Sequence, residues 1–209
     1  YQYYTPSLTE NVKHKLLVEN ELRQAIENND FHLNYQPQIR LENRKICGVE
    51  ALIRWQSANN GLIPPDVFIP IAEETGLINR IGDWVIENTF KQAIEWLEKG
   101  VDFGYIAINT SVHQFQNGEL PQKLQTLLKQ YQLDAKYFEL EITEGVLIKH
   151  PNHVLKQLNA IRDLGFFISI DDFGTGFSSM NYLKKLPVQK LKIDKSFISD
   201  IPQDLDDIA

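Results

Sequence analysis

From residue 46 onward, short apolar runs typical of β-strands alternate with amphipathic segments typical of α-helices. This alternation predicts a parallel α/β sheet or barrel. A further strand is predicted at 31–35, after a helix over 8–29, and the segment with Asn59, Asn60, Gly61, Pro64 and Pro65 reads as a loop. The later strands are predicted at 46–55, 103–109, 138–142, 166–170 and 191–193, with helices at 83–99, 121–131, 154–164 and, shorter, near 178–183.

One predicted strand, 166–170, ends in two adjacent carboxylates, Asp171 and Asp172, followed by Gly174 and Gly176. Adjacent acids repel each other and are costly to bury unless a positive group neutralises them. A divalent metal at the end of the strand would do so. Asp and Gly are also common in ordinary turns. This stretch alone favours neither interpretation.

Further polar residues lie on or at the ends of the other predicted strands, where parallel α/β folds gather their functional groups. Each has a structural explanation when taken singly: Glu50 could pair with Arg54, Asn109 could cap a turn, and Lys192 could extend to the barrel rim. Taken together they supply oxygen ligands from four strands and one amine. Oxygen donors without Cys or His favour Mg²⁺ or Mn²⁺ over zinc. The residues are Glu50, Asn109, Glu141, Glu144, Asp171, Asp172 and Lys192.

Charge and composition exclude some classes of function. The net charge of −7 argues against coating a nucleic-acid polymer or an anionic membrane. The only cysteine, Cys47, cannot form an internal disulfide, so we expect a buried thiol in a reducing compartment. No apolar run is long enough to span a membrane. His150 and His153 are close in sequence but have no third candidate ligand, and we expect them to be solvated.

The sequence resembles the EAL-domain family, the bacterial cyclic-di-GMP phosphodiesterases, from about residue 31 to the end. The signature is Glu50-Ala51-Leu52 followed by Ile53-Arg54-Trp55, and the other matching motifs follow in order. The first four residues also resemble the end of a GGDEF domain, which predicts a fragment of a larger GGDEF–EAL signalling protein. The other motifs are Tyr35-Gln36-Pro37, Phe68-Ile69-Pro70 with Ala72-Glu73-Glu74, Asn109-Thr110-Ser111, Glu141-Ile142-Thr143-Glu144, Asp171 to Gly176, and Lys192-Ile193-Asp194.

The resemblance implies a modified (β/α)8 TIM-like barrel whose first strand is antiparallel, and hydrolysis of cyclic-di-GMP to linear pGpG. A two-metal Mg²⁺ or Mn²⁺ site would activate water and neutralise charge on the phosphodiester. It also implies the following roles: Glu50, Asn109, Glu141 and Asp171 hold one metal; Asp171 and Asp172 hold the second; Lys192 binds the attacking water, with a pKa lowered by the neighbouring cations; Glu144 holds the loop after Asp172; and Gln36 and Arg54 contact substrate.

The family pattern has two further strands, which carry another metal-binding Glu and a Gln. We expect them to be absent because the sequence stops after the predicted strand 191–193. Residues 1–20 are expected to form a linker helix after an upstream GGDEF domain, and 21–209 an incomplete EAL domain. We also expect a homodimer in the cytoplasm, with any membrane anchor in other domains. The alternative is an inactive EAL domain that serves as a cyclic-di-GMP receptor or as a dimerising regulatory module.

Overall fold

A mostly parallel sheet organises the chain in the computed structural model, which describes residues 6–146, 151–174 and 183–197. In the described part the strand order is β1-β2-β4-β5-β6-β7, and β3 pairs with β2. β1 is antiparallel to β2, and β4 to β7 continue the sheet in parallel. This confirms the predicted α/β class with an antiparallel first strand. The strands are β1 Phe31–Ile39, β2 Ile46–Ser57, β3 Gly61–Ile63, β4 Ile106–Thr110, β5 Phe138–Thr143, β6 Phe167–Phe173 and β7 Lys190–Ile193.

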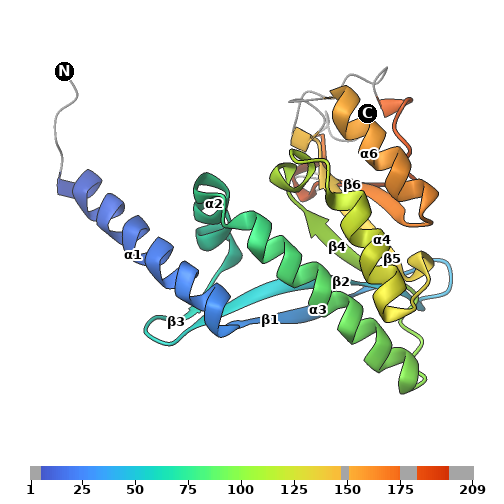
Figure 1. Cartoon of the computed structure of the whole chain (residues 1–209), viewed down its shortest axis with the longest axis horizontal. Helices are drawn as coiled ribbons and strands as arrows, with labels where there is room; N and C mark the ends of the chain where they lie inside the picture. The colour runs from blue at the N-terminus through green and yellow to red at the C-terminus, as the bar shows by residue number, and fades with distance from the viewer. Residues whose placement is uncertain (1–5, 147–150, 175–182, 198–209) are drawn as a thin grey trace.

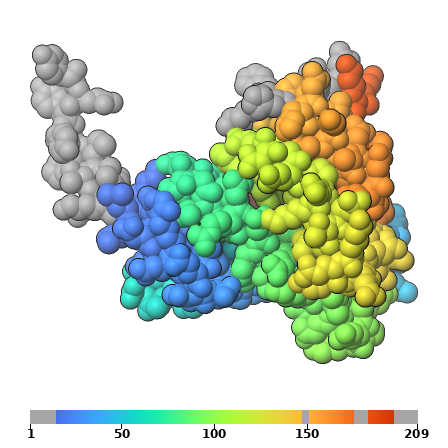
Figure 2. Space-filling view, viewed as in Figure 1, coloured from blue at the N-terminus to red at the C-terminus, as the bar shows by residue number. Residues whose placement is uncertain are grey.

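The helices lie along the sheet and at one end of the molecule (Figure 1). α1 lies at that end and packs beside α2, so that the two form one continuous surface (Figure 2). Among the described residues, no helix is both long and apolar enough to cross a membrane. The predicted short helix near 178–183 lies almost wholly outside the described residues. The helices are α1 Pro6–Asn28, α2 Pro65–Thr75, α3 Ile78–Glu98, α4 Leu120–Tyr131 and α6 Pro151–Asp163.

The loop prediction is wrong for two of its residues, Gly61 and Pro65, which belong to a strand and a helix. Gly61 begins β3, which forms a hairpin with the end of β2, where Gly61 is opposite Ser57. Pro65 begins α2, because proline is tolerated in the first helical turn, where a backbone N–H has no intrahelical acceptor. Gly76 ends that helix with φ of 74°, a left-handed conformation that glycine adopts without strain. The turn at Asn59 and Asn60 is confirmed.

Aromatic rings fill the space between the helices and the sheet. Phe90 of α3 stacks on Phe138 of β5 with ring centroids 4.1 Å apart, and neither side chain is exposed. Such stacking contributes beyond the area that the rings bury. The contact fixes α3 against the strand that carries Glu141.

Truncation of this ring tests whether the α3–β5 contact is part of the main core. We expect Phe90→Ala to lower the free energy of unfolding by about 3–5 kcal/mol, because the cavity cannot close around the stacked partner. Urea denaturation measures the change. Phe167→Ala, at a β6 ring that is 45% exposed, is the matched control and should change stability much less. Equal losses in the two variants would contradict this view of the core.

Candidate active site

Three carboxylates from different strands converge on one face of the sheet. Glu50 lies on β2, Glu141 on β5 and Asp171 on β6. One oxygen from each lies within 4.8 Å of the others. The three strands are parallel, with β4 between β2 and β5, and the three side chains come together because alternate side chains of a strand point to the same face of the sheet. The structure thus brings Glu50, Glu141 and Asp171 together in the described part of the chain.

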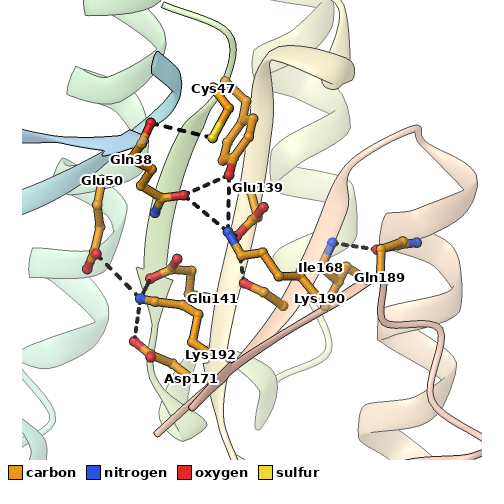
Figure 3. Close-up of polar contacts among 12 residues, drawn as sticks. Gln38, Cys47, Glu50, Glu139, Glu141, Ile168, Asp171, Gln189, Lys190 and Lys192 are labelled. Atoms are coloured by element: carbon orange, nitrogen blue, oxygen red, sulfur yellow. Dashed lines mark hydrogen bonds and ion pairs between the residues drawn. The ribbon is translucent and has the colours of Figure 1, made fainter. Parts of the chain in front are cut away.

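The ammonium group of Lys192 lies among these carboxylates (Figure 3). Its Nζ atom is 2.6 Å from Glu141 Oε2, 2.8 Å from Asp171 Oδ2 and 3.4 Å from Glu50 Oε2. Glu50 also accepts a hydrogen bond of 2.8 Å from Asn109 Nδ2. Glu50, Asn109 and Lys192 thus belong to one cluster, and a separate local contact for each residue does not explain their positions.

An ion pair between Glu50 and Arg54, the alternative explanation for Glu50, is not among the contacts of the described residues. Arg54 instead donates from Nη1 to the carbonyl oxygen of Ile53 at 2.8 Å. It lies four residues beyond Glu50 on β2 and lines, together with residues of α2, the cavity described below. Arg54 therefore belongs to a neighbouring part of the site.

Burial dominates the electrostatics of Glu141, whose exposed fraction is 1%. Burial raises the pKa of its carboxyl to about 7, against the opposing effect of Lys192. Its Oε1 atom has no hydrogen-bond partner among the described residues. One buried oxygen therefore lacks the compensation that an ionised carboxylate needs.

Lys192 shows the opposite balance. Burial alone would lower its pKa, but hydrogen bonds to Asp171 and Glu141 outweigh burial and raise it. The sequence-based expectation of a lowered pKa applied to an amine among cations. The acids of the chain act on this amine in the opposite direction and favour its protonated form.

The donor set fits a hard divalent cation. The converging atoms are carboxylate oxygens with the amide of Asn109 beside them, and Mg²⁺ and Mn²⁺ prefer such ligands. The unpaired Oε1 of Glu141 supplies a lone pair that no protein donor uses in the described part. Lys192 neutralises only one of the three negative charges, and a cation here would compensate the others.

Asp172 and Glu144 shape the end of β6. Asp172 adopts φ of 52°, and its backbone N–H donates to Asp171 Oδ1 at 3.0 Å. Burial, followed by the charge of Asp171, raises the pKa of the Asp172 carboxyl. The buried Glu144 accepts a hydrogen bond of 2.9 Å from the backbone N–H of Gly174. Glu144 thus ties the end of β5 to the turn after β6, and the rest of the loop through Gly176 lies outside the described residues.

A cavity of about 460 Å³ opens beside the carboxylates. Arg54, Asn109 and Asp172 line it, together with Ile69 and Glu73 of α2. Sequence reasoning assigns no site role to α2, although its motif Phe68-Ile69-Pro70 is among those that carry the family resemblance. Gln36 is exposed on β1, opposite Glu50 in the strand register, and is not part of the cavity lining.

Cys47 is only partly buried, so the expectation of a buried thiol is wrong in degree. Its Sγ atom donates to the carbonyl oxygen of Gln38 at 3.4 Å. His153 is exposed on α6, as expected for a solvated histidine, while His150 lies outside the described residues.

A family model described as the EAL domain matches residues 19–209. The chain belongs to the EAL domain family. The predicted family is thereby confirmed, and with it the TIM-like fold class.

Named relatives are similar over nearly the whole chain. The signaling protein YkoW of Bacillus subtilis is 48% identical over 201 residues, which are 96% of this chain and 25% of that protein. The bifunctional diguanylate cyclase/cyclic di-GMP phosphodiesterase MucR of Pseudomonas aeruginosa is 40% identical over 100% of this chain and 30% of its own length. This EAL domain thus spans between a quarter and a third of those relatives.

A solved structure agrees with the fold. The structure described as "PaMucR Phosphodiesterase, c-di-GMP complex" superposes with a TM-score of 0.86 at 41% identity, covering 92% of this chain and 78% of that chain. This EAL domain therefore shares its architecture with a phosphodiesterase domain solved with c-di-GMP.

Proposed function

We propose that this EAL domain hydrolyses cyclic-di-GMP to linear pGpG in bacterial second-messenger signalling. The observation that carries the proposal is the position of Lys192, whose ammonium lies 2.6–3.4 Å from three converging carboxylates. The name of MucR and the solved complex of its phosphodiesterase with c-di-GMP support the substrate class. The intact signature from Gln36 to Lys192 favours an enzyme over an inactive receptor.

The residues that would hold metal are those of the acidic cluster and its neighbours. Glu50, Asn109, Glu141 and Asp171 would hold one ion, while Asp171 and Asp172 would hold a second. Mg²⁺ or Mn²⁺ bound there would lower the pKa of a water molecule and neutralise charge on the phosphodiester.

The chain's own residues would orient the reactants. The amine of Lys192 already points into the cluster, so it would hydrogen-bond the attacking water. It would accept the proton of that water once neighbouring cations lower the pKa of the lysine. Glu50 is assigned to catalysis because it contacts both Lys192 and Asn109 and so fixes their relative positions. Glu144 would hold the turn at Gly174 next to Asp172.

Substrate contacts are assigned to Gln36 and Arg54. Arg54 lines the cavity next to Asn109 and Asp172, where its guanidinium could hold a phosphate through two hydrogen bonds. Gln36 lies opposite Glu50 on β1 and reaches the same face of the sheet.

The proposal includes a cellular setting. We place this EAL domain at 21–209, after a linker over 1–20 and an upstream GGDEF or sensory domain, in a cytoplasmic homodimer. MucR, whose name includes a diguanylate cyclase, supports the GGDEF partner. Any membrane anchor would belong to other domains.

Product analysis tests the proposal directly. The intact protein that carries this chain is incubated with cyclic-di-GMP and Mg²⁺, and the nucleotides are separated by chromatography. We expect linear pGpG that is lost in Glu50→Ala and Lys192→Ala. Tight binding without product would replace hydrolysis with the receptor function. Dimerisation with neither binding nor product would leave the regulatory module.

Replacing the metal tests its assignment. We expect Ca²⁺ to support little turnover, because its longer and more variable coordination fits a two-metal hydrolytic site less well than that of Mg²⁺. Initial rates with Mg²⁺, Mn²⁺ and Ca²⁺ at equal concentration give the comparison. Full turnover with Ca²⁺ would contradict the assignment of Mg²⁺ or Mn²⁺.

A further inference from the structure

A second polar cluster lies one layer of side chains away from the acidic site and is drawn above it in Figure 3. Its centre is Lys190, whose Nζ atom is 2.6 Å from Glu139 Oε1, 3.1 Å from the hydroxyl of Tyr105 and 3.2 Å from Gln38 Oε1. Tyr105 also donates to Gln38 Oε1 at 2.7 Å. We call these four side chains the second layer.

The second layer shares two strands, β5 and β7, with the acidic site. Glu139 precedes Glu141 by two residues on β5, and Lys190 precedes Lys192 by two residues on β7. Side chains two residues apart on a strand share a face, so each strand contributes one group to each layer. Ser169, two residues before Asp171 on β6, donates to Glu139 Oε1 at 2.8 Å and joins the two strands at this level.

Backbone pairing and apolar packing hold β7 weakly in the described part of the chain. β7 has four residues, and its pairing with β6 shifts register between Ile170 and Phe173. Its apolar side chains point outward, since Leu191 is 41% exposed and Ile193 65% exposed. A slip of one residue in register would turn both lysines away from the interior. The inward contacts of Lys190 and Lys192 therefore fix the register of β7.

Lys190 reaches across the interior of the sheet. It connects β7, at one end of the described strand order, to Gln38 of β1 at the other end. A contact between the two ends constrains the curvature of the sheet as well as the position of β7. Lys192 depends on both, because it must reach Glu50 on β2 from β7.

Gly48 makes room for the ring of Tyr105, and Gly104 lets the chain before Tyr105 approach the backbone of Cys47. A Cβ atom on Gly48 would lie 2.6 Å from the Tyr105 ring, which lies over β2 at this point. Gly104 has φ of 69°, and a Cβ atom there would lie 2.1 Å from the carbonyl oxygen of Cys47. The backbone on both sides of the ring thus depends on glycine, which indicates a specified position for Tyr105.

We infer that Lys190 is a positioning residue, which sets the register of β7 through Glu139, Tyr105 and Gln38 and so holds Lys192 among its carboxylates. Its role in turnover rests on the proposed hydrolysis. A buried ion pair is weak evidence for stability, and a determinant of register is its best-attested use. The role of Lys190 in the register of β7 does not depend on the proposed hydrolysis.

The test replaces Lys190 in the intact protein. Lys190→Met keeps the length of the side chain and removes its charge, and Lys185→Met, at an exposed lysine with Lys192 intact, is the matched control. We expect the kcat of Lys190→Met for cyclic-di-GMP to fall by about 10- to 100-fold with little change in KM, because misplacement of Lys192 affects the reaction more than substrate binding. Tyr105→Phe should show the same split with a smaller fall.

Hydrogen exchange of the metal-free proteins gives a second readout. We expect peptides that cover β7 to exchange faster in Lys190→Met and peptides from α3 to keep the wild-type rate, while Lys185→Met changes neither. Unchanged β7 exchange, or a loss that is equal in all peptides, would overturn the positioning role. A folded Lys190→Met variant with wild-type kcat would overturn it as well. If the wild type releases no pGpG, the proposed function fails, while the exchange result still decides the structural inference.

Discussion

Lys192→Met is expected to slow hydrolysis of cyclic-di-GMP by orders of magnitude while it strengthens metal binding. Loss of a group that accepts a proton from water reduces turnover by about 10²–10⁴-fold. The Lys192 ammonium contacts carboxylate oxygens of Glu141 and Asp171. Because a bound cation would compete with it for the same oxygens, its removal should tighten Mn²⁺ binding by about tenfold. Product chromatography and a Mn²⁺ titration measure the two effects.

The same substitution should destabilise the metal-free protein. Without Lys192, Glu50, Glu141 and Asp171 repel one another with no positive group between them. The melting temperature should fall in chelator and recover in Mg²⁺. Lys129→Met, at an exposed lysine on α4, is the control and should leave all three measurements unchanged. Weaker Mn²⁺ binding by Lys192→Met would show that the amine supports the metal site rather than competing with it.

The site was predictable from sequence because its residues break the pattern of their strands. Glu50, Glu141 and Lys192 each interrupt an apolar run, and a charge in such a position needs a partner. Strand alternation then places them on one face. The family motifs ordered these residues into a single site, which no residue alone could do.

Other features could not be predicted because they depend on tertiary contacts. Pro65 in isolation indicates a loop, and only the helix that follows it shows that it occupies a first turn. The raised pKa of Lys192 depends on acids from other strands. Lys190 and Glu139 look like ordinary surface charges in sequence, and their contact joins two strands that are far apart along the chain.

Glu141→Gln is expected to raise stability and remove activity, the reverse of the effect of Lys192→Met on stability. The side chain is 1% exposed, and glutamine keeps an oxygen that can accept from Lys192 while it removes the buried negative charge. Relief of that charge should raise the free energy of unfolding of the metal-free protein by about 1–3 kcal/mol above neutral pH. Loss of a carboxylate ligand should weaken Mn²⁺ binding and eliminate pGpG release.

The pH dependence gives this prediction its sign. The pKa of Glu141 is raised to about 7 in the folded chain, so its protonated form favours folding. Its contribution to stability is complete below the unfolded pKa and is lost as pH rises through about 7. The melting temperature of Glu141→Gln should therefore match that of the wild type near pH 5 and exceed it near pH 8, in chelator. Glu98→Gln, at an exposed carboxylate on α3, should follow the wild type at both pH values. A melting temperature of Glu141→Gln below that of the wild type near pH 8 would show that folding stabilises the ionised form of Glu141, with Lys192 outweighing burial.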